Sequence, residues 1–130
     1  MVAQVRILEV YLNEIAQREN ITGRAILESR ASLQAIRALT GSPNEVLFPI
    51  GAGIFVTASA VKTEKMLVDI GAGAVLEKTP QETVITLEGR IKELESALQT
   101  LQSQKGELAN QLAATRAAVS DIVDKARKGM

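Results

Sequence analysis

Apolar residues recur at alternating three- and four-residue spacings over roughly the first forty residues of the chain. This pattern predicts a coiled-coil helix, because it keeps one narrow apolar seam on the same side of successive turns. The seam positions hold apolar Val5, Leu8, Leu12, Ile15, Ile26, Leu33 and Ile36, and polar Glu19, Thr22, Ser29 and Thr40. Gly41, followed by Pro43, predicts the end of this helix, with Gly41 as a left-handed cap.

A second heptad pattern fills the C-terminal part of the chain. Thr79 is the expected N-cap, Pro80 the first helical residue and Glu82 the carboxylate of a capping box. The seam then runs through Val84, Leu87, Ile91, Leu94, Leu98, Leu101, Leu108, Leu112, Val119 and Ile122, with Lys105 and Thr115 as polar interruptions. Since neither helix can bury its seam alone, we expect the second to fold back antiparallel on the first. Parallel pairing with other chains is the alternative, and it leaves the middle of the chain without a role.

The middle segment, 46–78, has a different pattern. Short runs rich in Val, Ile, Phe and Thr are divided by turn residues, and the tetrad Ile-Gly-Ala-Gly occurs twice, at 50–53 and 70–73. Short β-rich runs separated by glycine turns predict β-hairpins. We therefore expect two hairpins, with Gly51, Gly53, Gly71 and Gly73 supplying the positive φ angles at their tips.

A phosphate-binding loop is the alternative interpretation of the two tetrads. Gly51-Ala52-Gly53 is followed by Ile-Phe-Val, with neither a third glycine at the required offset nor a Lys-Ser/Thr pair. No helix is expected to begin after either tetrad, so no helix N-terminus can receive the anion. The turn interpretation is the stronger one, and an enzyme with a nucleotide site here is disfavoured.

The composition narrows the possible functions. Lys+Arg and Asp+Glu are both 15, so no net charge attracts nucleic acid or anionic lipid. The chain has no Cys and no His, which removes disulfides, thiolate chemistry and the commonest general base and metal ligand. No apolar run reaches the length of a membrane span. We expect a cytoplasmic protein with no catalytic residues, no metal and no cofactor.

Four strands from one chain leave sheet edges open, and open edges pair with other chains. The sequence therefore predicts an α+β fold in which a long helical hairpin carries two central β-hairpins that are completed only in an oligomer. The residues expected at the contacts between subunits are Phe48, Ile50, Ile54, Phe55, Val56, Val68, Ile70 and Val75.

These features together resemble the prefoldin alpha-class subunit over essentially the whole chain. The most specific part is Leu47-Phe48-Pro49-Ile50-Gly51-Ala52-Gly53 with the later Asp69-Ile70-Gly71-Ala72-Gly73, and two hairpins favour the alpha class over the beta class. Ile54 followed by Phe55 departs from the family, where a small polar residue is commoner. The resemblance implies a single subunit, 1–130, made of helix 1–41, hairpins 46–78 and helix 79–128.

The resemblance also implies a function. Two alpha-class and four beta-class subunits would form a hetero-hexamer with a double β-barrel body and six coiled-coil tentacles. Their tips would hold unfolded client proteins without ATP and pass them to a group II chaperonin. A prefoldin-like structural filament or scaffold that assembles through its β edges is the alternative, and neither nucleic acid nor membrane is an expected partner.

The candidate client-binding residues lie where the two chain ends meet at the tip of the helical hairpin. They are Val2, Val5, Ile7, Leu8, Val10, Val119, Ile122 and Val123. Val5, Leu8, Val119 and Ile122 are also the last residues of the seam, so ordinary packing is their alternative role. Ile7, Val10 and Val123 fall off the seam. Nearby Lys125, Arg127 and Lys128 are best explained by the dipole at a helix C-terminus.

The polar seam residues predict one specific contact. In an antiparallel register set by the short connection, Thr22 lies opposite Lys105, with Glu19 one layer away. We therefore expect Glu19 and Lys105 to form an ion pair halfway along the coiled coil, with the aliphatic stem of the lysine packed in the seam.

Overall fold

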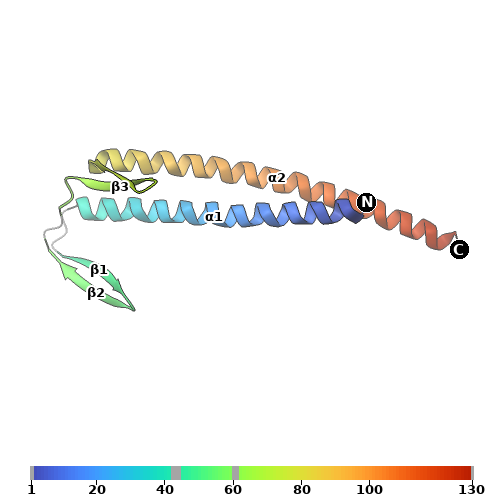
Figure 1. Cartoon of the computed structure of the whole chain (residues 1–130), viewed down its shortest axis with the longest axis horizontal. Helices are drawn as coiled ribbons and strands as arrows, with labels where there is room; N and C mark the ends of the chain where they lie inside the picture. Colours follow the sequence, from blue (N-terminus) through green and yellow to red (C-terminus); the bar gives the residue numbers. More distant parts are fainter. Residues whose placement is uncertain (1, 42–44, 60–61, 130) are drawn as a thin grey trace. The chain divides into compact units, whose positions relative to one another are not determined.

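The computed structural model describes residues 2–41, 45–59 and 62–129, so Pro43 lies outside the described residues. The element order is α1 (Val2–Thr40), β1 (Val46–Gly51), β2 (Ile54–Ala58), β3 (Met66–Gly71), β4 (Ala74–Lys78) and α2 (Pro80–Lys128). Figure 1 shows two long helices and two small hairpins, which is the α+β class expected from the sequence. The chain forms two compact units, residues 1–25 with 94–130 and residues 26–93, each described separately below.

Both helices bury the seam that the heptad pattern predicts. The buried apolar residues are Ile15 and Leu112 in the first unit, and Ile26, Leu33 and Ile36 in the second. Most other expected seam residues are half-buried, Glu19 and Thr22 among them. Burial of this one stripe supplies the hydrophobic free energy that a single amphipathic helix lacks.

The heptad pattern overestimates the seam at three positions. Thr40, Lys105 and Ile122 are exposed. At Thr40 the hydroxyl donates to the carbonyl oxygen of Ile36 at 2.8 Å, one turn back on its own helix. Ile122, expected as the last seam residue, is 53% exposed because α2 continues beyond the first residues of α1, as the red end of the ribbon in Figure 1 shows.

Within the first unit, two ion pairs fix the direction of the helices. Glu9 Oε1 accepts from Arg116 Nη2, and Glu19 Oε1 lies 3.5 Å from Lys105 Nζ. The α2 partner number falls as the α1 number rises, so the helices run antiparallel. The expected contact between Glu19 and Lys105 is confirmed.

The sequence predicts correctly where α1 ends and where α2 begins, but only one of the two predicted caps is present. At the start of α2, the backbone N–H of Glu82 donates to Thr79 Oγ1 at 3.2 Å, which confirms Thr79 as the N-cap. At the end of α1, the left-handed cap predicted for Gly41 is wrong, because its φ angle is not positive. α1 still ends at Thr40, and the Gly41 N–H donates to the carbonyl oxygen of Arg37 at 3.2 Å.

The two β-hairpins have the same architecture. β1 pairs antiparallel with β2, and β3 pairs antiparallel with β4. In each hairpin the register shifts just before the turn, which leaves Ile50 or Ile70 as an extra, bulged residue. The repeated tetrad is therefore a turn with its bulge, and a strand, not a helix, follows each copy.

The turns have positive φ angles at alanine as well as at glycine. Gly51, Gly53, Gly71 and Gly73 all have positive φ angles, as predicted. Ala52 and Ala72, at φ 52° and 53°, do too, which the sequence interpretation did not foresee. The two residues between the paired strand ends, Ala52-Gly53 and Ala72-Gly73, therefore both have positive φ angles, as in a type I′ turn. The backbone twist of such a turn matches the right-handed twist of the flanking strands.

The β3–β4 hairpin is attached to the first turns of α2 within its unit. Arg90 Nη2 donates to the carbonyl oxygen of Asp69 at 3.3 Å. Lys78 Nζ donates to Thr86 Oγ1 at 2.9 Å. These contacts join both strands of the hairpin to one helix.

Candidate functional site

The end of the paired helices in the first unit presents apolar side chains outside the seam. Ile7, Val10 and Val123 are 51%, 54% and 42% exposed. Val2 and Ile122 are exposed as well, whereas Val5, Leu8 and Val119 are half-buried in the seam. The eight candidate tip residues thus divide into an exposed group and a group whose packing between the helices accounts for their apolar character.

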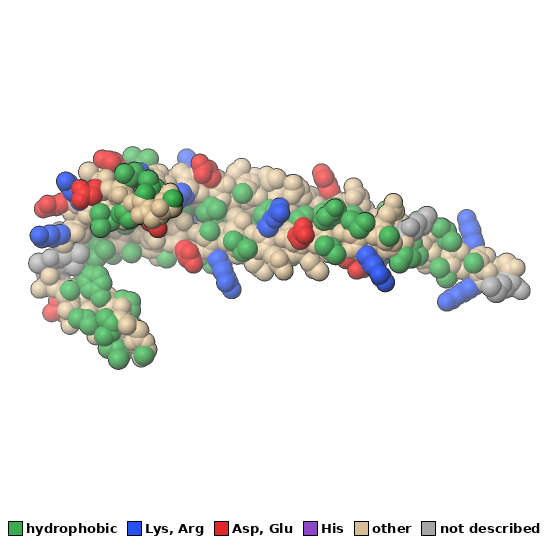
Figure 2. Space-filling model, viewed as in Figure 1, with side chains coloured by type: hydrophobic (Ala, Val, Ile, Leu, Met, Phe, Trp, Pro, Cys, Tyr) green, Lys and Arg blue, Asp and Glu red, His purple; other side chains and the backbone are tan. Residues whose placement is uncertain are grey.

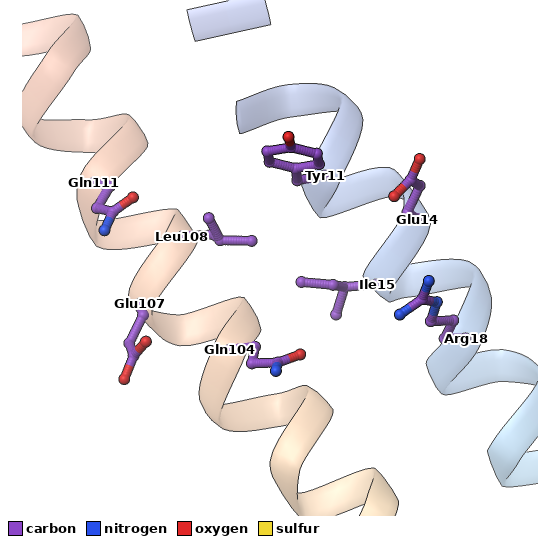
Figure 3. A pocket seen from close by; sticks show the side chains of 8 residues that line it. All are labelled: Tyr11, Glu14, Ile15, Arg18, Gln104, Glu107, Leu108 and Gln111. Atoms are coloured by element: carbon purple, nitrogen blue, oxygen red, sulfur yellow. The ribbon is translucent and has the colours of Figure 1, made fainter. Parts of the chain in front are cut away.

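A hollow of about 300 Å³ lies beside the seam of the same unit. Figure 3 shows Ile15 and Leu108 pointing toward each other from the two helices, with Tyr11 on the α1 side and Gln104 and Gln111 on the α2 side. Glu14, Arg18 and Glu107 complete the lining. Sequence reasoning did not select Tyr11, although an aromatic residue directly before seam residue Leu12 was a usable signal.

Two further hollows continue this one along the helices. One is lined by Gln4, Ile7, Leu8, Gln111, Ala114 and Thr115, and it shares Gln111 with the first. The other is lined by Arg18, Ile21, Thr22, Ala97, Thr100, Leu101 and Gln104, and it shares Arg18 and Gln104. Together they form a shallow groove lined by apolar side chains, amides, hydroxyls and the charged Glu14, Arg18 and Glu107.

The opposite side of the seam carries a charged contact. There the Glu9 carboxylate and the Arg116 guanidinium join the two helices. A surface ion pair of this kind contributes about 0.2–1 kcal/mol. One side of the coiled coil is thus bridged by this ion pair, whose residues do not line the groove on the other side.

The ion pair between Glu19 and Lys105 joins a half-buried seam residue of α1 to an exposed residue of α2. The Glu19 side chain is 18% exposed, whereas that of Lys105 is half exposed. Among the described residues, Glu19 Oε1 has no hydrogen-bond partner, although Lys105 Nζ is 3.5 Å away. The contact is therefore electrostatic without hydrogen-bond geometry, and it leaves a desolvated carboxylate oxygen incompletely compensated.

The hairpins expose a second apolar surface. Figure 2 shows apolar side chains, in green, gathered over the β1–β2 hairpin. Phe48, Ile50, Ile54, Phe55, Val56, Ile70 and Val75 are exposed, and Val68 is half-buried. Leu47, Leu67 and Leu76 are exposed too; the sequence prediction did not include them, although their places in the apolar strand runs were a usable signal. An isolated two-stranded hairpin is marginally stable in water, so this surface favours association with other strands.

The described residues 2–41, 45–59 and 62–129 offer little to a metal ion or a lipid bilayer. Within it, no three His, Cys, Asp or Glu side chains gather as a metal site would require. No described helix has the length and apolar character to cross a membrane. The apolar surfaces at the helix end, along the groove and on the hairpins are the candidate functional features of the described residues.

Comparisons with known proteins point to one family. The family model described as "Prefoldin subunit" matches residues 8–125. The chain is 32% identical over 124 residues to "Prefoldin subunit alpha" of Nitrosopumilus maritimus, covering 95% of this chain and 86% of that protein. It is 30% identical over 128 residues to "Prefoldin subunit alpha" of Methanocorpusculum labreanum, covering 92% of this chain and 87% of that protein.

The fold has a solved counterpart. It is similar to a chain in the cryo-EM structure of filamentous PFD from Methanocaldococcus jannaschii, with a TM-score of 0.76 and 22% sequence identity. The similarity covers 91% of this chain and 99% of the other. At this identity the similarity concerns the fold, and it includes both the long helices and the hairpins.

Proposed function

Because the chain belongs to the prefoldin family as an alpha-class subunit, we propose that it is part of an ATP-independent holdase. The observation that carries this proposal is the exposure of Ile7, Val10 and Val123 at the end of the paired helices, outside the seam. A holdase needs apolar surface that accepts many sequences rather than a pocket for one ligand. These residues, with Val2 and Ile122, are the proposed client contacts.

The hairpins are the proposed assembly surface. Residues 1–130 would act as one subunit, and the exposed strand residues, led by Phe48, Phe55 and Val56, would be buried in a β-barrel body shared with beta-class subunits. The stoichiometry implied by the family is two alpha and four beta. The open strand edges and apolar faces support this proposal, because an open edge can pair with a strand of another chain and the burial of apolar area is favourable.

The remaining parts of the proposal follow from the family role. The complex would pass its clients to a group II chaperonin in the cytoplasm, with no catalytic step of its own. The charge balance of the chain, with 15 basic and 15 acidic residues, is compatible with a partner that is neither nucleic acid nor membrane.

Light scattering of a chemically denatured protein diluted into buffer tests the holding activity. The assembled complex should suppress aggregation, and changing Ile7, Val10 and Val123 together to Ser should weaken the suppression. The matched control changes Ile21, Leu27 and Ile85 to Ser, since these aliphatic residues are 69%, 66% and 69% exposed, more than the test residues, but lie away from the helix end. If both triple variants suppress aggregation equally at unchanged oligomer size, Ile7, Val10 and Val123 are not the client contacts.

A filament subunit is the second candidate function. It is favoured by the solved counterpart, which comes from a filamentous PFD. Sizing of the chain alone and with a beta-class subunit separates the two: the hetero-oligomer proposal expects a discrete complex with the partner, whereas a filament subunit grows without limit by itself.

A further inference from the structure

Polar seam residues from both helices meet at one level of the first unit. Glu19 and Lys105 face each other there at 3.5 Å, and Glu19 Oε1 finds no hydrogen-bond partner in the described part of the chain. Thr22, the next seam residue of α1, is half-buried beside Leu101 in the same stretch of the groove. An apolar layer would bury more hydrophobic surface and leave no carboxylate oxygen to desolvate.

Two glycines weaken the helices at the same level. Gly23 directly follows Thr22 in α1, and Gly106 directly follows Lys105 in α2. A Cβ added at either glycine would meet no atom within 4 Å, so close packing does not explain them. Glycine inside a helix lowers the local helical equilibrium roughly fivefold relative to alanine.

We propose that Glu19, Thr22, Gly23, Lys105 and Gly106 form a seam joint, a level at which the paired helices open locally more readily than on either side. A weak seam and weak helices are independent features, and here they coincide on both helices. Local opening of a folded protein concentrates where buried apolar contacts are few. The role of the joint rests on the function proposed above. In the arm of a holdase, local opening at the joint lets the helix end move to fit clients of different size.

Hydrogen–deuterium exchange of the full-length chain in its assembled state, without client, measures this opening. Backbone amides at 19–23 and 103–107 are expected to exchange at least ~10-fold faster than those at 12–16 and 108–112 of the same unit. Equal exchange rates at the joint and in these flanking segments would overturn the proposal.

Two pairs of substitutions test the two causes separately. Gly23→Ala with Gly106→Ala should slow exchange at the joint ~10-fold by restoring helix propensity. The matched control is Gly89→Ala, because Gly89 is also helical with open space around its Cβ but lies outside the joint. This control should leave the joint unchanged.

Glu19→Leu with Lys105→Leu replaces the charged layer by an apolar one and should slow joint exchange ~10-fold or more. If neither pair slows exchange at the joint, or if Gly89→Ala slows it equally, the seam joint is wrong. Because exchange is read without client, failure of the aggregation assay leaves these results standing, and failure of the joint leaves the holdase proposal untouched.

Discussion

The two hairpins share a turn and a bulge but differ in charge. Each position of β1 and β2 has a counterpart in β3 and β4, so that Pro49, Thr57 and Ala58 correspond to Asp69, Glu77 and Lys78. The strands of the first hairpin carry no charged residue, whereas each strand of the second does. Charges on strand edges discourage unplanned pairing with other sheets.

The charged residues of the second hairpin also take part in local contacts. Lys78 reaches Thr86 of α2, Lys65 Nζ lies 3.5 Å from Glu77 Oε2, and Asp69 Oδ1 accepts from the Gly71 N–H at 2.8 Å. The same turn therefore occurs in an uncharged hairpin, β1–β2, and in a charged hairpin, β3–β4, that contacts α2. The second hairpin gains stability within its own chain, and the first is expected to depend more on other subunits.

The largest expected effect is on assembly through the first hairpin. Phe55→Glu should weaken subunit association by at least about 100-fold (about 3 kcal/mol), because an aromatic contact is lost and an unpaired charge is buried. The counterpart Val75→Glu should have a smaller effect, since its hairpin already carries charges and contacts α2. Sedimentation velocity over a concentration series measures both. A larger effect at Val75 would reverse the comparison.

A smaller effect is expected from detaching the second hairpin. Arg90→Ala removes the hydrogen bond to the carbonyl oxygen of Asp69 and should destabilise β3–β4 by about 0.5–1.5 kcal/mol. Amide exchange in β3 should rise toward that of β1. Lys92→Ala, at an exposed residue of the same helix, serves as the control. Unchanged protection in β3 would show that the arginine contact does not hold the hairpin.

The smallest expected effect concerns the turns. Ala52→Gly and Ala72→Gly should each stabilise the protein by about 0.5 kcal/mol, because the relief of left-handed strain at alanine exceeds the added chain entropy. The gain should be alike in the two hairpins, since their φ angles are nearly the same. Thermal unfolding measures it, and a lower melting temperature for either variant would contradict the strain argument.

The parts of the fold with a regular period were predictable from the sequence. The heptads identified the buried residues Ile15, Leu33 and Leu112, and the polar seam positions identified the pair Glu19 and Lys105. Both follow from side-chain spacing on a helix, which the sequence states directly.

Features that depend on backbone acceptors or local angles were not predictable in this way. The contact from Arg90 to the Asp69 carbonyl has no signature in residue type, because any residue offers that oxygen. The positive φ of Ala52 contradicts the usual preference of alanine, and Gly41 lacks the positive φ that a glycine at a helix end usually has. The groove beside Tyr11 is lined by side chains of both helices. The heptad spacing within each helix does not describe how the side chains of the two helices pack against each other, so it could not predict the groove.

The repeated bulge and turn also bear on how such chains can change over evolutionary time. Both hairpins begin and end between Thr40 and Pro80, outside either heptad series. A duplication or deletion of one whole hairpin therefore adds or removes a module without shifting the phase of the seam. The number of hairpins is thereby independent of the coiled-coil phase. It can change while both helices keep their heptad pattern.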